Sequence, residues 1–107
     1  RDLVRSRGLG DVYKRQTLWR TSLSTARRIL GEAHDLTVTI SINYARTLYE
    51  DTGATLDDLR EAVTMLEETA QTARRVFGGA HPITANIELH LQGARAALRA
   101  REAPSGK

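Results

Sequence analysis

The sequence predicts an all-α fold of about four helices, paired as antiparallel hairpins that stack into a short solenoid. The first observation is an internal repeat: "TARRILGEAHDLT" at 25–37 returns as "TARRVFGGAHPIT" at 72–84, with eight of thirteen positions identical at an offset of 47. The second is helical spacing of apolar residues, with no strand-like alternation. The third is a set of glycines between the helical segments. A period of this length is typical of stacked helical units.

The first predicted helix covers residues 17–30, and the third covers 56–77. One face of the first consists of Trp19, Leu23, Ala26 and Leu30, spaced i, i+4, i+7 and i+11. The face returns 47 residues later as Leu66, Ala70, Ala73 and Phe77. The third helix is therefore expected to repeat the first.

The second and fourth predicted helices cover residues 35–51 and 82–102 and read as amphipathic. The stripe of the second consists of Val38, Ile42, Ala45, Leu48 and Tyr49. The stripe of the fourth consists of Ile83, Ile87, Leu91, Ala94 and Leu98. Because the intervening loops are short, neighbouring helices should run antiparallel.

Helix starts and stops are marked by residue type. Thr55 and Asp58 have the spacing of a capping box, and Pro82 suits a first helical turn, which places His81 at the cap. Left-handed glycines can end each helix. The candidates are Gly31, Gly53, Gly78 and Gly79.

Charge divides the chain unevenly. Residues 1–16 hold five basic and two acidic residues, which accounts for the whole net charge of +3. This segment ends in "DVYKRQ", which resembles translated library-adaptor sequence, so we interpret 1–16 as a non-native or flexible leader. Residues 17–103 then form the helical repeats and 104–107 a disordered tail. Two repeat units are fewer than solenoids usually need, so the sequence reads as a fragment of a longer array.

Composition argues against several kinds of site and of protein. The chain has no cysteine, which rules out disulfides and thiolate metal sites. It has no apolar run of about 18 residues and no signal peptide, so we expect no membrane segment and a cytoplasmic location. No glycine-rich phosphate loop follows a strand, and we predict no cofactor.

The three histidines do not form a catalytic or metal site by spacing. His34 and His81 are equivalent in the repeat and stand at helix entries, so each is expected to bond the loop or the first turn. Glu88 and His90 are two residues apart, which on a helix directs them away from a common metal. We therefore predict no catalytic residues, no metal ligands and no enzyme activity.

At "LGEAHDLT" and "FGGAHPIT" the chain resembles the tetratricopeptide repeats (TPR) of kinesin light chains. Gly31, His34, Gly78 and His81 match that pattern, and "INYARTLY" resembles the following "NNLAxLY", so the likeness spans about 17–102. The departures are a period of 47 instead of 42, and His90 where the first unit has Asn43.

The resemblance implies a protein-interaction scaffold that binds a peptide or helical segment of a partner in a concave groove. Helices 35–51 and 82–102 would line it. The candidate contacts are Asn43, Arg46, Glu50 and His90. Asn43 matches a groove asparagine of the family, and an amide both donates to and accepts from a peptide backbone. The partner's identity and any link to motor transport stay open.

Two alternatives remain. The basic leader and the Arg pairs could bind nucleic acid or an anionic surface, although little net charge and few aromatic residues disfavour nucleic acid. The repeats could also be a structural spacer. As a fragment of a longer array, the chain alone is expected to expose apolar repeat faces and to self-associate.

Overall fold

The structure is a computed structural model that describes residues 2–103 and, for side chains, residues 10–11 and 13–103. It contains the helices α1 (Asp2–Leu30), α2 (Asp35–Tyr49), α3 (Leu56–Val76) and α4 (Pro82–Glu102). Only turns and short loops connect them within this range. The predicted all-α fold of antiparallel helical hairpins is confirmed.

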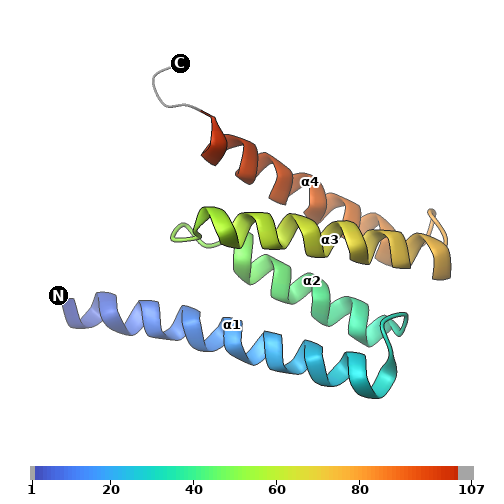
Figure 1. Cartoon of the computed structure of the whole chain (residues 1–107), viewed down its shortest axis with the longest axis horizontal. Helices are drawn as coiled ribbons and strands as arrows, with labels where there is room; N and C mark the ends of the chain where they lie inside the picture. Colours follow the sequence, from blue (N-terminus) through green and yellow to red (C-terminus); the bar gives the residue numbers. More distant parts are fainter. Residues whose placement is uncertain (1, 104–107) are drawn as a thin grey trace.

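The four helices lie side by side with alternating direction, so that each pair of chain neighbours forms an antiparallel hairpin (Figure 1). Helix α2 is the centre of the array, because it packs against α1, α3 and α4. The molecule measures 46 × 36 × 19 Å. Its smallest dimension is about the width of two helices with their side chains.

Helix α1 begins at Asp2, 15 residues before the predicted start at Thr17. The leader contains two glycines but no proline, and a glycine costs only about 1 kcal/mol relative to alanine in a helix interior. The helix therefore continues back through residues 2–16. The adaptor origin of this segment stays a prediction, and the predicted tail 104–107 lies outside the described residues.

Most residues of the predicted apolar faces form one core shared by all four helices, whereas Ala26 and Leu98 lie outside this cluster. Trp19 and Phe77 are partly buried against it, but Leu30 is 39% exposed, so the predicted face of α1 is wrong at its last position. Leu30 lies at the outer edge of the array, where no further helix covers it within the described chain. The buried apolar residues of this core are Leu23, Val38, Ile42, Tyr44, Ala45, Leu48, Ala62, Leu66, Ala70, Ala73, Ile87, Leu91 and Ala94.

The helix ends follow the predicted signals with small shifts. Gly31 and Gly78 have φ angles of +88° and +95°, which are the left-handed conformations that glycine adopts without strain. Gly53 and Gly79 do not adopt positive φ. Helices α2 and α3 end at Tyr49 and Val76, just before the predicted ends, since the following residues serve as C-caps.

The capping box at the start of α3 is confirmed. The Asp58 amide donates to the Thr55 hydroxyl over 3.0 Å, and the Thr55 amide donates to the Asp58 carboxylate over 3.1 Å. Two amides that the helix leaves without partners are thereby satisfied.

Candidate partner-binding groove between α1 and α2

An open groove of about 430 Å³ lies between α1 and the C-terminal half of α2. It brings together three of the four predicted contact residues, Asn43, Arg46 and Glu50, with the partly buried Trp19 across from them. The full lining is Arg15, Trp19, Asn43, Arg46, Thr47, Glu50 and Asp51. The groove is therefore both aromatic and charged.

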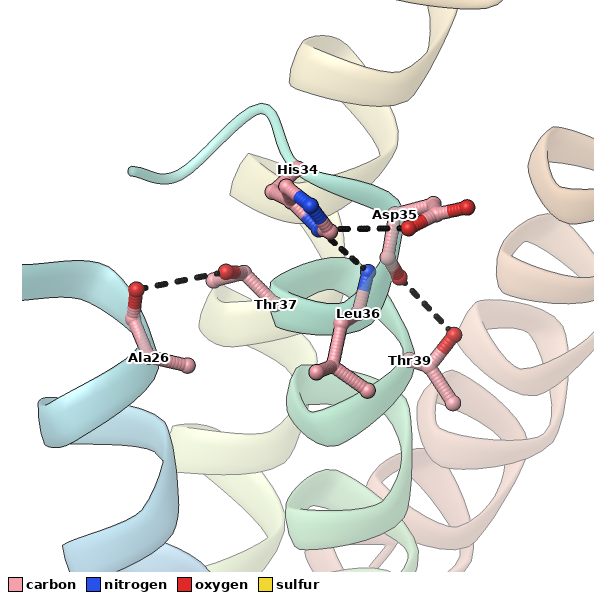
Figure 2. A network of polar contacts seen from close by, with 6 residues as sticks. All are labelled: Ala26, His34, Asp35, Leu36, Thr37 and Thr39. Carbon is pink, nitrogen blue, oxygen red and sulfur yellow. Dashed lines mark hydrogen bonds and ion pairs between the residues drawn. The ribbon is translucent and has the colours of Figure 1, made fainter. Parts of the chain in front are cut away.

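The α1–α2 corner that positions these two helices is held by a network of polar contacts (Figure 2). The Leu36 amide donates to Nδ1 of His34 over 3.1 Å, so His34 is the N-cap of α2. The Thr37 hydroxyl donates to the Ala26 carbonyl over 3.4 Å and ties α2 to α1. At the other end of the groove, Gln16 donates to the Thr47 carbonyl over 3.4 Å.

His34 Nδ1 also lies 3.2 Å from the Asp35 carboxylate. A ring nitrogen that accepts from an amide carries no proton, so the cap requires the neutral tautomer with the proton on Nε2. His81 is the cap of α4 in the same way, because its Nδ1 accepts from the Ile83 amide over 3.0 Å. The predicted structural role of both histidines is confirmed.

Asn43 and Arg46 on α2 and Glu50 at its C-cap lie on one side of the helix, since positions i, i+3 and i+7 share a helix face. Asn43 is half-buried, whereas Arg46 and Glu50 are exposed. Arg46 donates to Glu50 over 3.2 Å. An exposed i,i+4 ion pair of this kind contributes only about 0.3–0.5 kcal/mol, so a ligand can exchange it for its own contacts at little cost.

His90 does not line this groove, which lies between α1 and α2 and not, as the resemblance implied, between helices 35–51 and 82–102. Its Nδ1 lies 2.7 Å from the Tyr49 hydroxyl, and the two rings meet edge to face with centroids 6.1 Å apart. Burial lowers the pKa of His90, the positive charge of Arg46 lowers this pKa further, and Glu50 opposes the shift. His90 is thus close enough to sense the groove charges while its ring is engaged by Tyr49.

The contact between Tyr49 and α4 is a feature that sequence reasoning missed. A Cβ atom at Gly93 would lie 3.3 Å from the Tyr49 ring, so glycine leaves room for the aromatic side chain. The signal was present, because Gly93 stands 47 residues after Arg46, a position where the repeat loses its side chain. Burial raises the pKa of Tyr49.

Sequence reasoning also missed a polar link across three helices. Arg20 on α1 donates to the Tyr44 hydroxyl over 3.0 Å, and this hydroxyl donates to Glu61 on α3 over 2.9 Å. Burial raises the pKa of Tyr44, and the hydrogen bond with Tyr44 raises the pKa of Arg20. The link joins α2 to both α1 and α3.

Metal ligands, membrane helices and basic pairs are the remaining features of the described part of the chain. Across that part, no three potential ligands among His, Asp and Glu come together around a common metal position. Among the described residues, no helix combines the length and the apolar character needed to cross a membrane. The basic pairs lie in the last turns of α1 and α3, as expected for cations at helix C-termini.

Residues 54–83, which include all of α3 and the corner that follows it, match the tetratricopeptide repeat family. The match supports a tetratricopeptide class for this helical array. Repeats of this class generally mediate protein–protein interaction and form a non-enzymatic scaffold. No curated protein and no solved structure matches the chain.

Proposed function

We propose that this chain is a protein-interaction module whose α1–α2 groove binds a peptide or helical segment of a partner protein. The observation that carries this proposal is the convergence of Asn43, Arg46 and Glu50 with Trp19 in one open groove. Grooves with an aromatic anchor and a few polar groups are typical of protein recognition sites.

The lining suggests how a partner segment is held. Trp19 offers an aromatic surface that is only partly buried, and Asn43 beside it can pair with both the donor and the acceptor of a peptide unit. Arg15 and Arg46 stand near Glu50 and Asp51 in the same lining, so both signs of charge are available. This favours a segment with an apolar side chain flanked by polar residues.

The test uses a peptide library selected against the full chain, with binding followed by the fluorescence of Trp19, the chain's one tryptophan. Asn43→Ala is expected to weaken the selected peptides at least about 10-fold, which corresponds to about one lost hydrogen bond to a peptide. Thr39→Ala is the matched control, because Thr39 is exposed on α2 but is not part of the groove lining. Equal binding by both variants would contradict the proposal.

We further propose that the repeats are of the kinesin light chain type and act in the cytoplasm. Support comes from Gly31, His34, Gly78 and His81, which recur in one pattern at both corners, and from Asn43 in the groove. The pattern is consistent with the geometry, since the glycines terminate helices and the histidines cap the next ones. A fluorescent fusion of the chain should distribute through the cytoplasm, and exclusion from it would contradict the location.

The nucleic-acid alternative is less well supported than peptide binding. Arg74, a member of one Arg pair, is already engaged by Glu88 on α4. Deleting residues 1–14 removes most of the basic excess but leaves Arg15 and Gln16 in place. Peptide binding should survive this deletion, whereas loss of the selected peptides would favour the basic leader as the binding element.

A further inference from the structure

The groove between α1 and α2 has an equivalent on the side of the α3–α4 hairpin that packs against α2, and of these two only the first is open. A separate groove of about 550 Å³ between α3 and α4 is lined by other residues, among them Glu67, Arg74 and Arg95.

A second, apolar hollow of about 400 Å³ lies along the same faces of α1 and α2, and the two hollows together form the open groove. The apolar half of this groove is lined by Thr21, Ser22, Thr25, Ala26, Ile29, Leu30, Leu36 and Ile40. Leu36 is 50% exposed there, and Ile40 is half-buried. Ile87, which stands 47 residues after Ile40, is fully buried.

The polar half of the groove shows the same contrast. Trp19 and Thr47 line the open groove, whereas the residues 47 positions later, Leu66 and Ala94, are 0% exposed. At these positions the second groove is thus covered by something that the first groove lacks.

Helix α2 fills the second groove. Thr37 and Ser41 of α2 face Thr69 and Thr72 of α3 around one small gap. Thr69 and Thr72 are the repeat equivalents of Ser22 and Thr25. Further along, Tyr49 of α2 packs on α4 at His90 and Gly93, the equivalents of Asn43 and Arg46.

We infer that the open groove takes an amphipathic helix of the α2 kind, seated in the same register. This inference rests on the proposed function and names the form of its partner. The partner helix places small hydroxyl side chains over Ser22 and Thr25 and an aromatic side chain at Asn43 and Arg46. The contact of α2 with α3 and α4 is an interface within this fold. Because the open groove presents the equivalent surface of α1 and α2, a further helix can extend the same stacking.

A second copy of the chain does not offer such a face. The equivalents of the core residues Ala45 and Leu48 of α2 are Gln92 and Arg95 of α4. Arg95 donates to Glu67 over 2.9 Å, and Arg74 pairs with Glu88 on the same surface. This edge of the array is polar and ion-paired, so it does not match an apolar groove.

The test titrates a synthetic peptide with the sequence of residues 35–51 into the full chain. We expect a saturable change in Trp19 fluorescence at a 1:1 ratio, with a gain in helical circular dichroism. The Ile42→Pro peptide, which cannot form the helix, should bind at least about 30-fold more weakly. On the chain, Leu36→Gln should weaken the parent peptide, whereas Leu89→Gln, at a residue 65% exposed on α4, should not.

A second measurement applies if the free peptide is too weakly helical to bind. A variant of the full chain carries a second copy of residues 17–63, inserted before Thr17. This copy places a complete α2 beside the open groove at high effective concentration. The melting temperature should rise by about 10 °C or more, because each stacked unit adds a neighbour interface. Leu36→Gln in the original unit should remove much of this gain.

Three results would overturn the inference. Equal binding of the Ile42→Pro peptide would show a groove for extended segments, and would leave the proposed function standing. Absence of helix-selective binding together with no rise in melting temperature would show that no helix docks there. A dimer of the unmodified chain that Leu36→Gln dissolves and that the peptide displaces would identify a second copy as the occupant.

Discussion

The two helix–loop–helix corners of the molecule share their local geometry but differ in what surrounds them. At the α1–α2 corner and at the α3–α4 corner, a left-handed glycine ends one helix and a histidine side chain caps the next. The threonine three residues after each histidine makes different contacts at the two corners. Thr37 donates to the Ala26 carbonyl, whereas the Thr84 hydroxyl is buried without a partner among the described residues.

The reason lies in the carbonyl that Thr84 would need. The equivalent of Ala26 is Ala73, whose carbonyl accepts from the amides of Phe77 and Gly78 over 2.8 and 3.2 Å. The tighter ending of α3 therefore occupies the acceptor that remains available at the end of α1. Local caps repeat because they depend on a few adjacent residues, while longer contacts vary with the packing around them.

The largest expected effect distinguishes the filled groove from the open one. Ile87→Ala removes a fully buried side chain and should lower the free energy of unfolding by about 2–5 kcal/mol. Ile40→Ala, at the equivalent half-buried position, should cost about 1 kcal/mol. Urea denaturation of both variants measures the difference. Equal losses would contradict the assignment of one groove as filled and the other as open.

The capping histidines should be equivalent. His34→Ala and His81→Ala each remove an N-cap acceptor and should each cost about 1 kcal/mol of stability, measured by thermal unfolding. The corresponding Asn substitutions keep a cap acceptor and should restore most of the loss. A cost confined to one histidine would show that the two corners are not local copies of each other.

Valine at the two threonines should act with opposite signs. Thr37→Val loses a buried hydrogen bond and should lower stability by about 1 kcal/mol. Thr84→Val removes a buried hydroxyl without a partner and should leave stability unchanged or raise it by about 1 kcal/mol. Chemical denaturation of the two variants measures the difference. Equal losses of stability would contradict the finding that the Thr84 hydroxyl has no partner among the described residues.

The smallest effect concerns pH, because His90 titrates while its equivalent Asn43 does not. Burial, with a further contribution from Arg46, lowers the pKa of His90 in the folded chain, and Glu50 opposes this. The unfolded chain, with an ordinary histidine pKa of about 6.5, therefore binds the proton more readily. Stability should decrease as pH falls below about 6.5, until His90 is also protonated in the folded chain.

His90→Gln should remove this part of the acid sensitivity. The measurement compares the urea midpoints of both proteins at pH 7.5 and pH 5. An equal loss of stability at pH 5 in the variant would show that other groups cause the acid sensitivity.

The sequence was sufficient for the elements of the fold that depend on neighbouring residues. The spacing of Trp19 and Leu23, the pair Thr55 and Asp58, and the cap at His81 each determine local structure through contacts within a few turns. The start of α1 at Asp2 was not predicted, because residues 2–16 show no apolar stripe and their helix is an extension of the one that follows.

The groove was predictable only in part. Asn43, Arg46 and Glu50 share a helix face, which follows from spacing alone. The engagement of His90 by Tyr49 depends on the approach of α4 to α2, and it requires the missing side chain at Gly93. Such contacts between helices distant in sequence are set by packing, which the periodicity of a single helix does not encode.

The most direct test of the account is the accessibility of equivalent positions in the two grooves. The chain has no cysteine, so the single substitutions Thr47→Cys and Ala94→Cys place one thiol in each groove. In the folded chain, the thiol at position 47 should react with a labelling reagent at least about 100-fold faster than the thiol at position 94, where reaction requires local opening. Equal labelling rates would contradict the claim that α2 fills one groove and leaves its equivalent open.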